Sequence, residues 1–170
     1  NEVKKKIKKY HFSNLGVSRY KKINYIGNNF LDFDKKKTNS YYLKTFEEIV
    51  KKKIKKSNYI YGIKKFIKDN YKNYLFFISS ATPQNELYEI VKYKKIHPFF
   101  KEVLGSPDNK TRHIKKIIKK YKLKKKEVLF IGDTKKDLQT AIQSNINFFG
   151  IQNKYENFEN FNIKVKNFMN

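Results

Sequence analysis

From residue 61 to residue 151 the sequence alternates short apolar runs with helical stripes, and this alternation is the feature that most limits its fold. Four apolar runs are short enough to be buried strands: residues 74–78, 102–104, 128–131 and 148–151. Between them apolar residues recur at helical spacing, most regularly at Ile114, Ile117, Ile118 and Tyr121. Strands that alternate with helices pair in parallel through right-handed crossovers. The sequence therefore predicts an α/β fold built on a doubly wound parallel sheet.

The first third of the chain carries helical patterns only. A Lys-rich segment ends near Tyr10, and after a break at 13–16 two further apolar stripes cover residues 20–30 and 43–54. We therefore predict a helical region over 1–58, an α/β core over 59–152 and a C-terminal tail over 153–170.

Composition excludes several classes of protein. The chain of 170 residues contains no cysteine, so it has neither disulfides nor a zinc site with thiolate ligands. Hydrophobic residues make up 39% of it, which is enough for a core. No apolar run approaches the roughly 20 residues of a membrane span, and no signal-peptide pattern opens the sequence. These features predict a soluble cytoplasmic protein without a membrane partner.

The formal net charge of +25 raises the question of a nucleic-acid partner. Arginine, which recognises phosphate and base edges with a bidentate fork, occurs only at Arg19 and Arg112 among the 40 basic residues. The lysines are scattered, and Lys, Asn, Ile, Tyr and Phe are abundant together, as an AT-rich genome would encode. The composition therefore argues against a nucleic-acid partner, although a basic nucleic-acid-binding module stays open as an alternative.

Polar side chains follow three of the predicted strands. The hydroxyls of Ser80 and Thr82 follow the first, the ammonium of Lys110 follows the second, and the carboxylates of Asp133 and Asp137 follow the third. In parallel sheets, ligands bind at the carboxyl ends of the strands. These groups could hold a phosphoryl group beside Mg²⁺. We expect Ser80, Lys110 and Asp133 to converge on one cavity.

The same three segments resemble motifs of the haloacid dehalogenase superfamily, especially its phosphoglycolate-phosphatase-like and phosphoglucomutase-like members. FFISSATP is similar to the second motif of that family, GSPDNKTRHI to the third and VLFIGDTKKD to the fourth. The resemblance covers about residues 60–152, and residues 1–58 look like the helical cap of the family. It implies a Mg²⁺-dependent phosphatase that acts on a small phosphorylated metabolite through an aspartyl-phosphate intermediate.

The resemblance also implies roles for individual residues. Ser80 would bind a phosphoryl oxygen, and Lys110 would neutralise charge on the phosphoryl group and the nucleophile. Asp133 would be a ligand of Mg²⁺, and Asp137 would hold that ligand network in place without contacting the metal.

Two further side chains are candidates for substrate binding, Thr82 in the core and Arg19 in the helical region. Each candidate has a simpler alternative. Ser80 could be a turn residue, Lys110 and Arg19 surface charges, and Asp133 a helix N-cap. Asp137 could be an acid in the first turn of a helix. The three histidines, His11, His97 and His113, share no metal-ligand spacing, so packing or surface roles suit them.

The family's chemistry also needs a nucleophile, the first aspartate of an Asp-x-Asp motif that follows a buried strand. Asp32 and Asp34 have this spacing, but a helical stripe precedes them and Lys35 stands where a turn glycine is expected. The cap-like region also precedes Asp32, whereas it should follow the nucleophile. We interpret Asp32 and Asp34 as a false match, while a family member without a cap stays an open alternative.

We therefore expect the nucleophile on a strand upstream of Asn1, which would make the chain a fragment without activity of its own. In the family fold that strand is central and lies between the strands that end at Ser80 and Asp133. Its absence would leave a gap in the sheet with unpaired backbone groups on both sides. A non-catalytic relative of the family is the third alternative. The sequence does not indicate the substrate or the oligomeric state.

Overall fold

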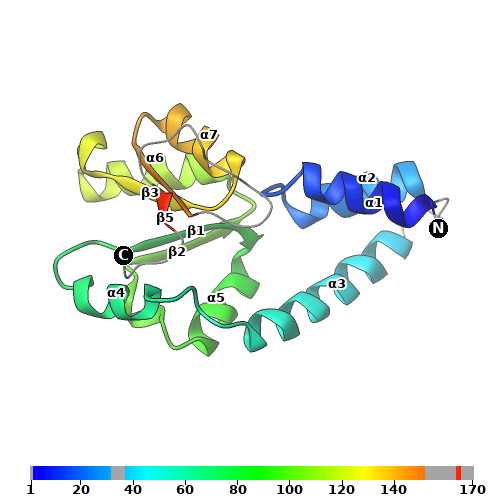
Figure 1. The fold of residues 1–170 in the computed structure, drawn as a ribbon, viewed down its shortest axis with the longest axis horizontal. Coiled ribbons are helices and arrows are strands. Elements are labelled where there is room, and N and C mark those ends of the chain that lie inside the picture. The colour runs from blue at the N-terminus through cyan, green and yellow to red at the C-terminus, as the bar shows by residue number, and fades with distance from the viewer. Residues whose placement is uncertain (1, 32–36, 152–163, 166–170) are drawn as a thin grey trace. The chain divides into compact units, whose positions relative to one another are not determined.

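The computed structural model describes residues 2–31, 37–151 and 164–165. The chain divides into two compact units, Asn1–Ser57 and Asn58–Asn170 (Figure 1). We call them the helical unit and the α/β unit. The predicted boundary after residue 58 lies next to this division, and the role of the helical unit as a cap stays a prediction.

Three helices form the helical unit: α1 (Glu2–Ser13), α2 (Arg19–Phe30) and α3 (Lys37–Lys56). Helix α2 packs against both α1 and α3. The apolar stripes that predicted these helices face one another, and Tyr10 stacks on Tyr25 with 4.1 Å between the ring centroids. Neither α1 nor α2 has a fully buried side chain. The unit is therefore held by partly exposed contacts rather than by a closed core.

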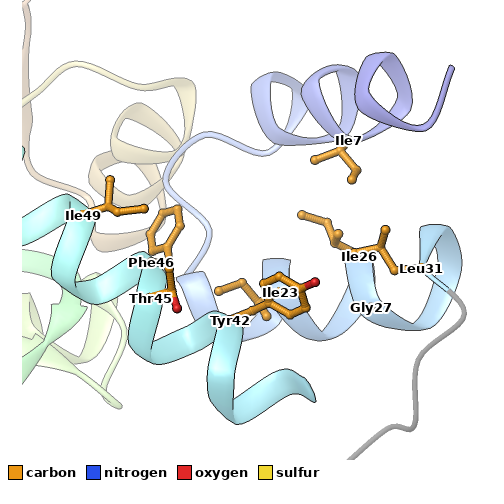
Figure 2. Close-up of a pocket in the computed structure, with 9 residues that line it drawn as sticks. All are labelled: Ile7, Ile23, Ile26, Gly27, Leu31, Tyr42, Thr45, Phe46 and Ile49. Atoms are coloured by element: carbon orange, nitrogen blue, oxygen red, sulfur yellow. The ribbon is translucent and has the colours of Figure 1, made fainter. Parts of the chain in front are cut away.

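An apolar cavity of about 290 Å³ lies among these helices (Figure 2). Side chains from all three helices point toward it, including Ile7 from α1, Ile26 from α2 and Phe46 from α3. No acidic residue lines it. Among its described lining residues, Tyr42 and Thr45 are the only ones with polar side chains, and neither is charged.

The α/β unit alternates helices and strands. In chain order its elements are α4 (Ile63–Asn70), β1 (Phe77–Pro83), α5 (Gln84–Tyr93), β2 (Glu102–Ser106), α6 (Lys110–Tyr121), β3 (Leu129–Gly132), α7 (Lys135–Ser144), β4 (Asn147–Ile151) and β5 (Lys164–Val165), with short 3₁₀ turns at His97–Phe99 and Lys125–Glu127. All of the strand pairs are parallel. The predicted α/β fold with parallel strands is confirmed.

The described strands form two separate sheets. Strand β1 pairs with β2, while β3, β4 and β5 form a second sheet in that order. Among the described strands, β1 and β3 therefore each have one strand partner. Ser80 lies on β1 and Asp133 directly follows β3, and a further strand between β1 and β3 stays a prediction.

Helix α6 packs against both β1 and α7, and so connects the two sheets. Its buried face carries His113, Ile114 and Ile117, which follow the predicted helical spacing. Ile67 from α4, Leu87 and Val91 from α5 and Ala141 from α7 are also buried. The core of the α/β unit thus lies between the strands and the helices that pack against them.

One prediction of element bounds was wrong. The strand predicted at 74–78 begins only at Phe77 and continues to Pro83. Tyr74 and Leu75 follow the turn after α4 and are 62% and 44% exposed, so they are apolar residues outside the core. Within the segment predicted as a tail, Lys164–Val165 pairs with the end of β4, a tertiary pairing that leaves no periodic signal in the sequence. No helix in the described ranges combines the length and apolar character that a membrane crossing requires.

Candidate active site

The carboxyl end of β1 contains a bulge. Ser79 lies opposite Leu104 and Pro83 opposite Ser106, so β1 has more residues than β2 in this interval. A bulge interrupts the pairing and redirects side chains. Here it brings two hydroxyls together, because Ser80 Oγ donates to Thr82 Oγ1 at 3.0 Å and accepts from the Thr82 N–H at 3.1 Å.

Lys110 is the first residue of α6, after the N-cap Asn109. Its Nζ lies 2.5 Å from Asp137 Oδ1 at the start of α7. The side chain of Asp137 is only 2% exposed and that of Lys110 is 21% exposed. Lys110 is therefore not a free surface charge, and the alternative reading of it does not hold.

The carboxylate of Asp137 is bonded at both oxygens. Its Oδ2 accepts hydrogen bonds from the hydroxyl and the N–H of Thr134, at 2.7 Å and 3.3 Å. Thr134 Oγ1 in turn accepts from the Asp137 N–H at 3.2 Å, which completes a reciprocal capping box. The N-cap of α7 is thus Thr134 and not Asp133, and Asp137 is an acid of the first helical turn, as one of the alternatives proposed.

Gly132 makes this arrangement possible. A Cβ at position 132 would lie 2.4 Å from Asp137 Cβ and 2.7 Å from Asp137 Cγ. Contacts of that length do not occur, so a larger residue would displace either β3 or Asp137. The glycine of the GDTKKD segment is needed for close packing.

Asp133 lies between Lys110 and Asp137 in the sequence, and the charges of both affect its pKa. Burial raises its pKa above the ordinary value, the negative charge of Asp137 raises it further, and the ammonium of Lys110 lowers it. A carboxylate in such a position gains more from a nearby cation than an exposed one does. Lys110, Asp133 and Asp137 therefore form one charged cluster, which we call the charged triad.

The family model described as haloacid dehalogenase-like hydrolase matches residues 3–151. The chain belongs to this family. As a member of it, the chain is a hydrolase-family protein. That the bulged strand end, Lys110 and the GDTKKD turn are its second, third and fourth motifs stays a prediction. No curated protein matches the sequence.

Solved structures of haloacid dehalogenase-like proteins have the same fold. A Clostridium difficile protein assigned as a phosphatase is 22% identical, with 86% of this chain and 74% of that chain covered and a TM-score of 0.69. A predicted phosphoglycolate phosphatase from Haemophilus somnus is 16% identical, covering 88% and 71%, with a TM-score of 0.67. A Thermotoga maritima protein assigned as a β-phosphoglucomutase is 13% identical, covering 97% and 78%, with a TM-score of 0.68. At these identities the likeness shows the fold alone.

The structure brings some of the predicted site residues of this family member together. Lys110, Asp133 and Asp137 form the charged triad, and Ser80 and Thr82 share one hydrogen-bonded strand end. Strands β1 and β2 end at the same edge of their sheet. That Ser80 and Asp133 line one cavity stays a prediction.

Arg19 lies in the helical unit. Its guanidinium carbon is 5.4 Å from the ring centroid of Phe46, and it lines a second cavity of about 340 Å³ together with His11 and Lys22. Burial and the ammonium of Lys22 both lower the pKa of His11, which indicates a positively charged surrounding. A role of Arg19 in substrate binding stays a prediction.

Asp32 and Asp34 lie outside the described residues. The residues before them form helix α2 up to Phe30, followed by Leu31 in an extended conformation. A first motif of the family would need a buried strand in that place. The helix agrees with the interpretation of this Asp-x-Asp as a false match.

Asp133 is the member of the charged triad that could hold Mg²⁺. Within the described ranges, no three His, Asp or Glu side chains gather as a metal site. Asp133 supplies the hard carboxylate oxygen that Mg²⁺ prefers, whereas both oxygens of Asp137 are already bonded. Because Mg²⁺ usually keeps several waters and binds phosphate oxygens, one such carboxylate fits as part of its coordination shell.

Sequence reasoning missed two residues that shape this end of the sheet, Gln84 and His113. His113 is 2% exposed and bonded at both ring nitrogens. One signal was available: His113 lies beside Ile114 on the apolar face of α6 and one helical turn after Lys110, where a buried polar side chain needs partners.

Proposed function

We propose that this chain carries the phosphate- and metal-binding residues of a Mg²⁺-dependent phosphatase that acts on a small phosphorylated metabolite. The observation that supports this most is the buried ion pair of Lys110 and Asp137 beside Asp133. An exposed lysine gains little stability from an ion pair. Lys110, in contrast, is fixed by Asp137 beside Asp133, whose ionised form is disfavoured by burial. Such an arrangement suits the binding of a group that carries negative charge and arrives with a cation.

Each residue has a distinct part in this proposal. The hydroxyls of Ser80 and Thr82 donate hydrogen bonds to phosphoryl oxygens in place of their mutual bond. Lys110 places its ammonium near the phosphoryl group, and Asp137 keeps that ammonium in position. These interactions are strongest where negative charge develops, so they favour the transition state over the bound substrate.

Asp133 would hold Mg²⁺, which when bound neutralises charge on the phosphoryl oxygens and on the attacking carboxylate. The carboxylate of Asp133 is suited to this part because burial and the charge of Asp137 both raise its pKa, so a cation beside it would stabilise its ionised form. Asp137 would act on it indirectly, through Lys110 and Thr134.

The reaction itself needs a carboxylate nucleophile that forms an aspartyl-phosphate, and we expect it on a strand upstream of Asn1 rather than at Asp32. The separation of β1 from β3 supports this expectation, because a strand between them would present its carboxyl end to both Ser80 and Asp133. The helical unit would then be the cap that shapes access to the site.

A hydrolysis assay tests the proposal. The 170-residue chain, the natural gene product that contains it, and the Asp133→Asn and Asp32→Asn variants of both should be compared at equal concentration with p-nitrophenyl phosphate and Mg²⁺, with and without EDTA. We expect turnover by the gene product that EDTA abolishes and that Asp133→Asn lowers strongly, whereas Asp32→Asn changes it little. No turnover in any protein would favour a non-catalytic relative. Metal-dependent turnover by the 170-residue chain that Asp32→Asn abolishes would refute the choice of nucleophile.

The net charge of +25 gives nucleic-acid binding as a second candidate. Binding to phosphate backbones weakens steeply as salt is raised, because counterions are released. Retention on DNA that falls steeply as salt is raised and is unchanged in Asp133→Asn would favour this candidate over the phosphatase.

A further inference from the structure

Gly105, the residue of β2 opposite the bulge in β1, is held by side chains at both of its backbone polar groups. Its N–H donates to Gln84 Oε1 at 2.6 Å, and its carbonyl oxygen lies 3.1 Å from His113 Nε2. Gln84 Nε2 also donates to the carbonyl oxygen of Val103 at 2.9 Å. Two side chains from the helices that follow β1 and β2 therefore fix the end of β2.

His113 connects three elements. Its Nδ1 lies 2.9 Å from Ser79 Oγ on β1, its Nε2 bonds Gly105 on β2, and the residue itself belongs to α6. Because a carbonyl oxygen only accepts, Nε2 carries the proton, and in the neutral ring Nδ1 accepts from the hydroxyl of Ser79. Burial lowers the pKa of His113, which favours this neutral form. Both ring nitrogens are thus used in one orientation of the ring.

The residues that His113 holds are the neighbours of the proposed phosphate-binding groups. Ser79 directly precedes Ser80 in β1, and Lys110 lies one helical turn before His113 on α6. Gly105 is in close contact with the bulge, since a Cβ there would lie 2.6 Å from the carbonyl oxygen of Thr82. A shift of Gly105 would therefore move the backbone that carries Thr82.

We propose that His113, assisted by Gln84, is a positioning residue that fixes the Ser80–Thr82 hydroxyl pair relative to Lys110. His113 does not touch the phosphoryl group. It acts by setting where the end of β1 and the start of α6 lie, so that the hydroxyls and the ammonium can bind the same group. This inference rests on the proposed phosphate-binding role of Ser80 and Lys110.

The substitution His113→Leu removes both hydrogen bonds and keeps an apolar side chain in the core. His97→Leu is the matched control, because His97 lies in a 3₁₀ turn outside the site and packs against Tyr88. Two quantities should be measured in the 170-residue chain: the affinity for inorganic phosphate with Mg²⁺, by phosphorus NMR, and the hydrogen exchange rate of the Thr82 amide. We expect His113→Leu to weaken phosphate binding about tenfold and to speed Thr82 exchange about tenfold, and His97→Leu to change neither.

A double-mutant cycle with Ser80→Ala separates positioning from general stability. If His113 acts through the Ser80 hydroxyl, His113→Leu should weaken phosphate binding little once that hydroxyl is gone. Equal losses in both backgrounds, or an unchanged Thr82 exchange rate in His113→Leu, would overturn the inference. Should His113→Leu fail to fold, Ser79→Ala removes the hydrogen bond to Nδ1 with a smaller change in volume and is judged by the same outcomes.

The two readouts also distinguish the failure of this inference from the failure of the proposed function. If the unsubstituted chain binds no phosphate, the proposed function is wrong at this site, and the Thr82 exchange rate alone decides whether His113 fixes the strand end. If the chain binds phosphate and His113→Leu leaves affinity and exchange unchanged, only the positioning role is wrong.

Discussion

Asp133 carries a charge that the folded chain disfavours. Burial and the nearby charge of Asp137 raise its pKa, so ionising this carboxylate costs more in the folded chain than in the unfolded chain. Residues of this kind are common at functional sites, where stability is lost for the sake of binding. Removing the charge of Asp133 should therefore not lower the stability of the fold, whereas it should weaken the proposed metal binding.

The raised pKa of Asp133 determines how the stability of the Asp133→Asn variant, relative to the unsubstituted chain, should depend on pH. Because the folded pKa of Asp133 is above its unfolded value, the unfolded chain holds fewer protons between the two values, and stability falls as the pH rises through the folded pKa. We expect Asp133→Asn to be at least as stable as the unsubstituted chain at pH 7 and to lose this advantage below the ordinary pKa of an aspartate. Urea unfolding over a range of pH measures the difference, and an Asn variant that is less stable at pH 7 would contradict the prediction.

Gly132→Ala should destabilise the α/β unit through a steric clash. The new Cβ would be forced against Asp137 at 2.4 Å, and overpacking of this kind costs about 1–3 kcal/mol. It should also displace the carboxylate from Lys110. Asp137→Asn should then cost less stability in the Gly132→Ala background than in the unsubstituted chain. Equal costs of Asp137→Asn in the two backgrounds, measured by urea unfolding, would mean that the ion pair survives.

At the scale of elements, the N-termini of α6 and α7 offer a matched comparison. Asn109 caps α6 through one bond, in which its Oδ1 accepts from the Arg112 N–H at 2.9 Å. Thr134 caps α7 in the same way and in addition donates to the buried carboxylate of Asp137. Loss of an N-cap costs about 1 kcal/mol, and Thr134→Ala also leaves a buried charge with fewer partners.

We therefore expect Thr134→Ala to lower the free energy of unfolding by about 2 kcal/mol and Asn109→Ala by about 1 kcal/mol. Both caps belong to the α/β unit, so one unfolding transition followed by circular dichroism compares them. Equal losses would show that the hydroxyl bond to Asp137 adds nothing to the cap.

The helices could be predicted wherever their buried residues recur at helical spacing in the sequence. The stripe from Ile114 to Tyr121 predicted α6 because its spacing is that of a helix with one buried face. The strand before Ser80 was misplaced because Tyr74 and Leu75 are as apolar as true strand residues. Their exposure depends on the turn after α4, which is a tertiary property.

The sequence motifs of the site could be recognised from the sequence, whereas the contacts among its side chains could not. The order of polar residues after the strands predicted that Ser80, Lys110 and Asp133 converge. The structure places Lys110 and Asp133 near Asp137, and their convergence with Ser80 stays a prediction. The bulge that pairs the hydroxyls of Ser80 and Thr82 had no signal in the sequence, because it appears only in the register between β1 and β2. The bonds of His113 were hidden for the same reason: they join residues that are 34 and 8 positions apart.

At the scale of the whole molecule, the net charge of +25 should oppose folding through repulsion among the lysines. Raising the ionic strength from about 0.01 M to 0.15 M shortens the screening length from about 30 Å to 8 Å. We expect the Tm to rise over this range in sodium chloride, as measured by calorimetry. A Tm that falls would mean that attractive pairs such as Lys110 with Asp137 outweigh the repulsion.

The two separate sheets have a consequence for the order in which the chain is made. Strands β1 and β2 are joined by α5 and a short 3₁₀ turn, and β3 and β4 by α7, so each pair needs only a contiguous stretch of sequence. Such local pairings close quickly. At synthesis rates of roughly 5–20 residues per second, Ser106 would leave the ribosome at least about one second before Gly132 does. The first sheet could therefore fold on the nascent chain before the second exists, and α6 would join the two afterwards.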